Sequence, residues 1–154
     1  MRSQVRFFCS YASKDARLVS SLLDRLLPHL KASRAHEYVV WEFHRLLTGE
    51  RWHERIQEEI EACDFGLLFL SPDFLASDYI RKEELPPLLE RKGIVPVGLK
   101  PVDLRLSDAQ SLDAYQLFRL RTAGGQLRWY SEARGADRDA FALELFRQIE
   151  GRLA

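Results

Sequence analysis

The fold is decided by the stretch FGLLFLSPD, residues 65–73. Its first six residues are apolar with almost no polar alternation, as in a strand of a parallel sheet that helices cover on both faces. Ser71 and Pro72 follow at once, and this pair is typical of a helix N-cap and a first helical position. The stretch therefore predicts a central strand over 65–70 that leads directly into a helix.

Strand and helix patterns alternate on both sides of this stretch. We expect strands at 5–10, 38–43, 65–70 and 93–99, a weaker one near 117–120, and helices at 13–30, 52–63, 72–85, 86–92 and 137–153. Pro86 and Pro87 should interrupt the helix after Leu85 because each lacks an N–H group. Pro96 indicates that its strand lies toward a sheet edge. The alternation implies a parallel, doubly wound sheet.

Composition limits the classes of protein to consider. The 154 residues fit one domain over 1–154, which a longer effector protein could carry, and 46% are apolar. Lys+Arg and Asp+Glu number 23 each, so nothing favours a nucleic-acid partner. With no apolar run of about 18 residues and no signal-peptide pattern, we expect a cytoplasmic location away from membranes. Cys9 and Cys63 are expected to be buried free thiols.

Several kinds of site are disfavoured by the motifs. The chain has no glycine-rich dinucleotide or Walker motif and no G-x-S-x-G elbow. The four histidines (His29, His36, His44 and His53) show no metal-ligand spacing with one another or with the cysteines. We therefore expect neither a metal nor a bound cofactor.

Three longer stretches carry a family resemblance. They are VRFFCSYASKD (5–15), VVWEFHRLLTGERW (39–52) and IEACDFGLLFLSPDFLASDYIRKEEL (60–85). In this order they resemble the motifs of TIR domains, the Toll/interleukin-1 receptor and resistance-protein family, in its prokaryotic form. The third resembles the family pattern S-P-x-F-x-x-S-x-W-C-x-x-E-L. The resemblance covers 5–99 and, by architecture, the last helix. It implies a flavodoxin-like three-layer α/β sandwich with a five-stranded parallel sheet.

The resemblance implies two functions, which stay open. One is cleavage of NAD at its nicotinamide–ribose bond, which gives nicotinamide and ADP-ribose or a cyclic ADP-ribose. NAD would then be a substrate of a glycohydrolase in immune or antiphage defence, active on self-association. The other is a non-enzymatic module that signals by contact between TIR domains, often through the loop after the second strand. In both cases we expect other TIR domains as partners.

The catalytic candidate comes from the motif spacing. In the family a glutamate four residues after a tryptophan stabilises the ribosyl cation; here Tyr79 takes the tryptophan position and Glu83 follows. Residues four apart share a helix face, whereas Glu84 would point about 100° away, toward solvent or a salt bridge. We predict that Glu83 is catalytic and that Tyr79 packs on nicotinamide. Without the resemblance, Glu83 would be interpreted as an ordinary solvated acid and Tyr79 as a packing aromatic.

The remaining candidates follow the first two strands, because parallel α/β sheets bind ligands at the carboxyl ends of their strands. We predict substrate contacts from Ser10, Tyr11, Glu42, Phe43 and Arg45. Each has a structural alternative: capping and packing for Ser10 and Tyr11, a surface acid for Glu42, core packing for Phe43, and a solvated loop cation for Arg45. Trp52 is expected to anchor its helix by packing.

Overall fold

The computed structural model describes residues 2–43 and 48–154. Its main sheet consists of parallel strands β1 (Ser3–Ser10), β2 (His36–Trp41), β3 (Phe65–Leu70) and β4 (Gly93–Gly98). The strand order is β2-β1-β3-β4, so β1 and β3 meet at the centre. The chain leaves β1 toward β2 on one side and continues through β3 to β4 on the other. The point where the order reverses therefore lies between Ser10 and Leu70, at the carboxyl edge.

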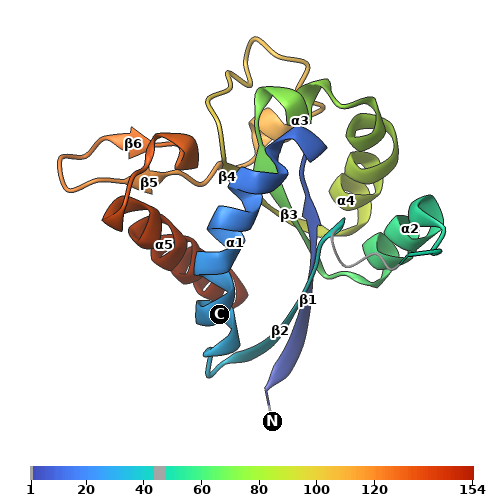
Figure 1. Ribbon diagram of the computed structural model, residues 1–154, viewed down its shortest axis with the longest axis horizontal. Helices are drawn as coiled ribbons and strands as arrows, with labels where there is room; N and C mark the ends of the chain where they lie inside the picture. The colour runs from blue at the N-terminus through green and yellow to red at the C-terminus, as the bar shows by residue number, and fades with distance from the viewer. Residues whose placement is uncertain (1, 44–47) are drawn as a thin grey trace.

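Helices cover both faces of this sheet (Figure 1). Helices α1 (Ala16–Lys31) and α5 (Ala136–Leu153) pack together on one face, and α2 (Trp52–Ala62) and α4 (Leu85–Arg91) lie on the other. The short helix α3 (Pro72–Ala76) follows β3, and single 3₁₀ turns lie at Ser13–Asp15, Leu112–Ala114 and Tyr130–Glu132. The predicted flavodoxin-like three-layer α/β class is confirmed.

The central strand divides its side chains between two hydrophobic cores. Leu67 and Phe69 pack in the core beneath α1 and α5, whereas Leu68 and Leu70 pack in the core beneath α2 and α4. This two-sided burial explains why the stretch is apolar without alternation. Cys9 and Cys63 lie in different cores, where both are buried and form no disulfide among the described residues, as predicted.

The expected fifth strand is reduced to one bridge, so the described part of the sheet has four strands instead of five. Phe118 N donates to Pro96 O at 2.9 Å, and Gly98 N donates to Phe118 O at 2.8 Å. A further rung would need an N–H from Pro96, which proline lacks. The chain instead turns into the antiparallel hairpin β5 (Leu120–Arg121) and β6 (Leu127–Arg128). Strand β4 is an edge strand, as Pro96 indicated.

The helix after β3 is interrupted at a different place from the one predicted. It breaks at Ser77, which has an extended backbone, and a π-helical turn over Ile80–Glu84 then leads without a break into α4. Pro86 and Pro87 lie in the first turn of α4, where missing N–H groups are tolerated. The prediction of a break at these prolines was wrong because the π turn had already changed the hydrogen-bond register before them.

Candidate functional site

A cavity of about 380 Å³ lies beside the carboxyl ends of β1 and β2. Its walls come from these two strand ends, from α2 and from the π-helical turn. This is the edge where the strand order reverses and where parallel α/β proteins bind ligands. The volume is near the lower end of the ~300–1,000 Å³ range of small-molecule sites. The fold therefore supplies a site where the loops after the strands were expected to form one.

Glu84, and not Glu83, is the carboxylate of this cavity. Glu84 is 8% exposed and lines the cavity, whereas Glu83 is exposed and is absent from its walls. Ser10 Oγ, at the end of β1, donates a hydrogen bond of 2.6 Å to Glu84 Oε1. The predicted placement of both glutamates is therefore reversed: Glu84 faces the site and Glu83 faces solvent.

The π-helical turn is the physical reason for the reversal. Leu85 N donates to Ile80 O, five residues back, instead of the four of an α-helix. Because a π turn contains an extra residue, positions five apart share a face, and Tyr79 and Glu84 both line the cavity. The prolines maintain this arrangement, because Pro87 has no N–H for Glu83 O. That carbonyl accepts a hydrogen bond from Gln57 Nε2 at 3.3 Å instead.

Burial sets the charge state of the site. It raises the pKa of Glu84 from 4.5 to about 7, and the hydrogen bond from Ser10 opposes this rise. Among residues 2–43 and 48–154, Glu84 forms no ion pair, and burial and the hydrogen bond from Ser10 are the causes that act on its pKa. Tyr11 also lines the cavity, and burial, with Glu42 next in importance, raises its pKa well above the ordinary value. Near neutral pH the site thus contains a half-ionised carboxyl and a neutral phenol.

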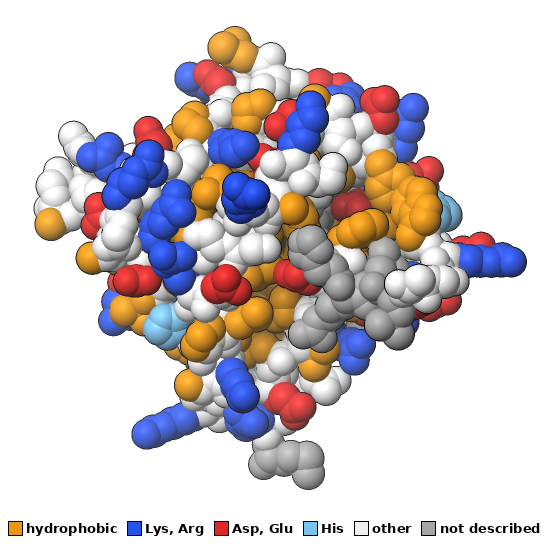
Figure 2. Space-filling model, in the orientation of Figure 1, with side chains coloured by type: hydrophobic (Ala, Val, Ile, Leu, Met, Phe, Trp, Pro, Cys, Tyr) orange, Lys and Arg blue, Asp and Glu red, His pale blue; other side chains and the backbone are white. Residues whose placement is uncertain are grey.

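Aromatic side chains form the mouth of the cavity. Tyr79 lies 5.2 Å from Trp52 between ring centroids, and its hydroxyl is 2.8 Å from His53 Nδ1. Trp52 is 52% exposed and Phe43 is 49% exposed, and both line the cavity. The packing role expected for Trp52 was wrong, because this ring lies at the surface. Figure 2 shows hydrophobic side chains gathered near α2, at the right of the view.

The other predicted contacts divide between the cavity and its surroundings. Ser10 is buried behind Glu84 and does not line the cavity, but its hydroxyl donates a hydrogen bond to the Glu84 carboxylate, which does. Glu42 is half-buried near Tyr11 and is not among the lining residues. Arg45 lies outside the described residues. The site therefore brings together Tyr11, Phe43 and Tyr79 around Glu84, with Ser10 behind it.

Sequence reasoning missed Trp41, the last residue of β2. Its ring stacks on Phe8 with a centroid distance of 5.4 Å and an interplanar angle of 14°, and it lines the cavity. The indole N–H is buried and has no hydrogen-bond partner in the described part of the chain. A buried donor without a partner is costly, and it could donate to a ligand. Its position before the predicted site loop was the signal that could have found it.

A second buried carboxylate stabilises the same sheet edge. Asp15 accepts a hydrogen bond from Ser71 Oγ and forms an ion pair of 2.6 Å with Lys100 Nζ. These residues follow β1, β3 and β4, so the contacts join three strand ends. Asp15 therefore has a cationic partner, whereas Glu84 forms no ion pair with any residue that the structure describes.

No cluster of three or more His, Cys, Asp or Glu side chains suited to a metal occurs among residues 2–43 and 48–154. Over the same residues, none of the helices has both the length and the apolar composition needed to cross a membrane.

Fold and site together define a flavodoxin-like α/β domain with a buried carboxylate in a cleft at the carboxyl edge of its sheet. The chain belongs to the TIR domain family, whose model matches residues 7–128. It is also similar to the uncharacterized protein y4lF of Sinorhizobium fredii, with 34% identity over 101 residues. The matched region makes up 66% of this chain and 30% of that relative, so the chain spans well under half of the relative's length.

Proposed function

We propose that this TIR domain is an NAD glycohydrolase that cleaves the nicotinamide–ribose bond, with Glu84 as the catalytic carboxylate. The observation that carries the proposal is the burial of Glu84, without a cationic partner among the described residues, in the cavity at the carboxyl edge of the sheet. A buried, ionised carboxylate without a counter-charge destabilises the folded state. Carboxyl groups with a perturbed pKa in clefts are typical of active sites, where function explains why they are kept.

The chemistry requires little more than such a group. Nicotinamide leaves NAD as a neutral molecule and takes the bonding electron pair, so the ribose becomes an oxocarbenium-like cation. The ionised carboxylate of Glu84 stabilises that positive charge in a site of low dielectric constant. Water then adds to the ribose carbon and loses a proton, which gives ADP-ribose. If a nitrogen of the adenine adds instead, the product is a cyclic ADP-ribose.

The neighbours of Glu84 have distinct positioning roles in this proposal. Ser10 holds Oε1 at 2.6 Å and leaves the other carboxylate oxygen for the ribose hydroxyls. Tyr79 and Trp52, at a centroid distance of 5.2 Å, offer aromatic faces for nicotinamide. The indole N–H of Trp41 is a buried donor that a ribose or phosphate oxygen can satisfy. Glu83 has no role in the reaction.

Self-association is part of the same proposal. A cavity of about 380 Å³ is suited to the nicotinamide riboside half of NAD and leaves the other half outside. Its mouth exposes Phe43 and Trp52, two large aromatic side chains of the kind that are enriched in protein interfaces. We infer that a second copy of the domain packs against this mouth and encloses the rest of the substrate, as suits a defence effector activated by assembly.

A purely interacting TIR module is the rival function. It has no use for a buried, partly ionised carboxylate in a cleft, and the burial of Glu84 therefore favours the enzyme. The exposed aromatic side chains at the mouth of the cavity are explained equally well by an interaction module and by an enzyme that self-associates.

Nicotinamide release from NAD at high protein concentration separates these functions. We expect wild type and Glu83→Gln to release nicotinamide at similar rates, because Glu83 is exposed, and Glu84→Gln to lose at least ~100-fold in rate. Equal rates for wild type and Glu84→Gln would exclude Glu84 as the catalytic group. If the assembled wild-type protein releases no nicotinamide, the domain is an interaction module and not an NAD glycohydrolase.

A further inference from the structure

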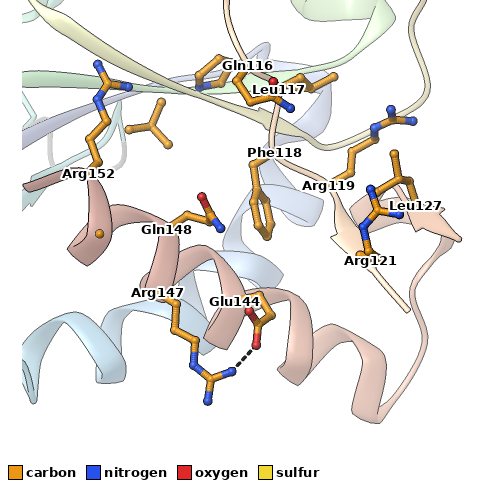
Figure 3. Close-up of a pocket in the computed structure, with 13 residues that line it drawn as sticks. Gln116, Leu117, Phe118, Arg119, Arg121, Leu127, Glu144, Arg147, Gln148 and Arg152 are labelled. Atoms are coloured by element: carbon orange, nitrogen blue, oxygen red, sulfur yellow. Dashed lines mark hydrogen bonds and ion pairs between the residues drawn. The ribbon is translucent and has the colours of Figure 1, made fainter. Parts of the chain in front are cut away.

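A second cavity, of about 680 Å³, lies beyond the edge strand β4 (Figure 3). Its walls come from β4, the C-terminal half of α5, residues 116–121 and the tip of β6. It shares no lining residue with the cavity of Glu84, and the proposed NAD cleavage makes no use of it. Its volume falls within the range of small-molecule sites.

The side chains of this cavity are strongly basic. Its charged residues are Arg119, Arg121, Arg147, Arg152 and Glu144. Four cations and one anion stand out in a chain whose formal net charge is zero. Figure 2 shows further Lys and Arg side chains gathered over the β5–β6 hairpin and the start of α5. The positive potential of the cavity is therefore a local property and not a reflection of composition.

Most of these guanidinium groups lack a counter-charge. Arg147 pairs with Glu144, whereas Arg121 donates to Gly125 O at 3.0 Å and Arg152 donates to Ile94 O at 2.7 Å. In residues 2–43 and 48–154, neither Arg121 nor Arg152 contacts a carboxylate, and Arg119 likewise contacts none. Three positive charges around one cavity are thus left for an anion.

Arg119 is held rigidly in this wall. Its guanidinium lies 4.9 Å from the centroid of Trp129, and its Nε is buried without a hydrogen-bond partner among the described residues. A Cβ at Gly98 would lie 2.7 Å from Arg119 Cγ and 2.8 Å from Trp129 Cε3, so this stack rests directly on the backbone of β4. A preordered donor without a partner loses little conformational entropy when a ligand binds.

The open half of the β4 edge does not suit a peptide strand. The next rung of the ladder would require an N–H from residue 96, which is proline, and the free O of residue 94. Ile94 O already accepts the hydrogen bond from Arg152. The backbone edge is therefore blocked, and a small molecule that contacts the side chains is the occupant that fits.

We propose that this cavity binds a phosphate-bearing small molecule of nucleotide size. Figure 3 shows Arg119 and Arg121 together near Leu127, Arg152 at the opposite end, and Phe118 and Gln148 between them. The planar guanidinium groups of Arg119 and Arg121 suit bidentate contacts with phosphate oxygens. The ring of Phe118 and the amide of Gln148 then contact the uncharged part of the ligand.

Calorimetric titration of the whole chain with pyrophosphate, ADP and adenosine tests the site. We expect pyrophosphate and ADP to bind, ADP more tightly, and adenosine to bind far more weakly than ADP. Arg121→Gln removes an exposed guanidinium and should weaken ADP binding about tenfold or more, as expected for loss of a charge-assisted hydrogen bond. Arg91→Gln is the matched control, because Arg91 pairs with Glu61 on the other face of the sheet.

Three results would overturn the proposal. They are absence of pyrophosphate and ADP binding, equal ADP affinity of Arg121→Gln and wild type, and ADP binding no tighter than pyrophosphate. Trp41→Phe separates the two cavities, because it removes the N–H donor that the cavity of Glu84 offers to a phosphate oxygen. Retained ADP binding in this variant supports a site beyond β4, whether or not NAD is cleaved, whereas lost binding would assign the phosphate contact to the other cavity.

Discussion

Ser10 and Glu84, 74 residues apart in the chain, are joined by a buried hydrogen bond of 2.6 Å at the carboxyl edge of the sheet. Ser10 belongs to the first strand and Glu84 to the π-helical turn that forms part of the cavity wall. The bond lowers the pKa of Glu84 against the larger effect of burial, which leaves that pKa at about 7. The end of β1 therefore increases the ionised fraction of Glu84 at neutral pH, against the larger effect of burial.

Removing this bond should change the pH dependence of NAD cleavage. In Ser10→Ala, the pKa of Glu84 rises further because the ionised form loses its donor. The pH at which the rate reaches half its maximum should move up by about one pH unit, the effect of ~1.4 kcal/mol. Rates of nicotinamide release between about pH 5.5 and about pH 9 measure this midpoint. Ser10→Thr keeps a hydroxyl and should restore it; an unchanged profile in Ser10→Ala would refute the role of Ser10.

Glu84 should also make stability depend on pH. Its folded pKa of about 7 lies above the ordinary 4.5, so its contribution to stability is complete below about pH 4.5 and is lost as pH rises through 7. Because glutamine does not ionise, Glu84→Gln does not lose stability at this position as pH rises. Relative to wild type, the variant should gain up to about 3 kcal/mol in free energy of unfolding between about pH 5 and about pH 8.5. Urea denaturation at both values measures the change.

Glu83→Gln is the control for that measurement, because Glu83 is exposed one position away on the same turn. Its stability relative to wild type should be nearly the same at both pH values. A gain equal to that of Glu84→Gln would mean that surface charge, and not burial, causes the effect.

The aromatic mouth should act in substrate binding through the ring of Tyr79. Tyr79→Ala removes the ring that lies 5.2 Å from Trp52 and should lower kcat/KM about tenfold, since aromatic contacts contribute ~0.5–1.5 kcal/mol. Tyr79→Phe keeps the ring and loses only the hydroxyl, with its contacts to His53 and Gln57, so its activity should stay near wild type. Steady-state kinetics of NAD cleavage distinguish the two, and equal losses would assign the effect to the hydroxyl.

Because side chains pack closely against β4 at Gly98, adding one methyl group there should lower the free energy of unfolding. In Gly98→Ala the new Cβ would meet Arg119 Cγ, Trp129 Cε3 and, at 3.1 Å, Phe118 O. We expect a loss of ~1–3 kcal/mol in free energy of unfolding, the usual cost of overpacking. Gly151→Ala on α5 is the control, because nothing lies within 4 Å of its Cβ, and it should be neutral or slightly stabilising. A stable Gly98→Ala protein would show that the Arg119–Trp129 stack can move.

Much of the fold was predictable because the local signals agree with one another. The unalternating stretch 65–70 has the same bounds as β3, and Ser71 caps α3 by accepting a hydrogen bond from Phe74 N. The reduction of the fifth strand was only partly predictable: the missing N–H of Pro96 is visible in the sequence, whereas the hydrogen bond from Arg152 to Ile94 O is not. Such long-range contacts leave no periodic signal.

A cavity lies at the sheet edge where the substrate contacts were predicted, but the carboxylate that lines it is Glu84 and not Glu83. Counting from Tyr79 assumed an α-helix, and the count led to Glu83. The family pattern also ends in adjacent glutamate and leucine, and in this chain that pair is Glu84 and Leu85. Giving this second signal more weight would have identified the buried carboxylate. The π turn itself depends on a hydrogen bond between Leu85 and Ile80, which residue types alone do not specify.

The π turn has a consequence for comparing this chain with its relatives. The π turn places one extra residue between Tyr79 and Leu85. A relative with an ordinary α-helical turn therefore has one residue fewer between the equivalents of these two positions. A gap-free alignment anchored on the aromatic residue pairs the glutamate in the motif of such a relative with Glu83. One anchored on Leu85 pairs it with Glu84. Alignments of this segment should therefore place a one-residue gap before Glu84.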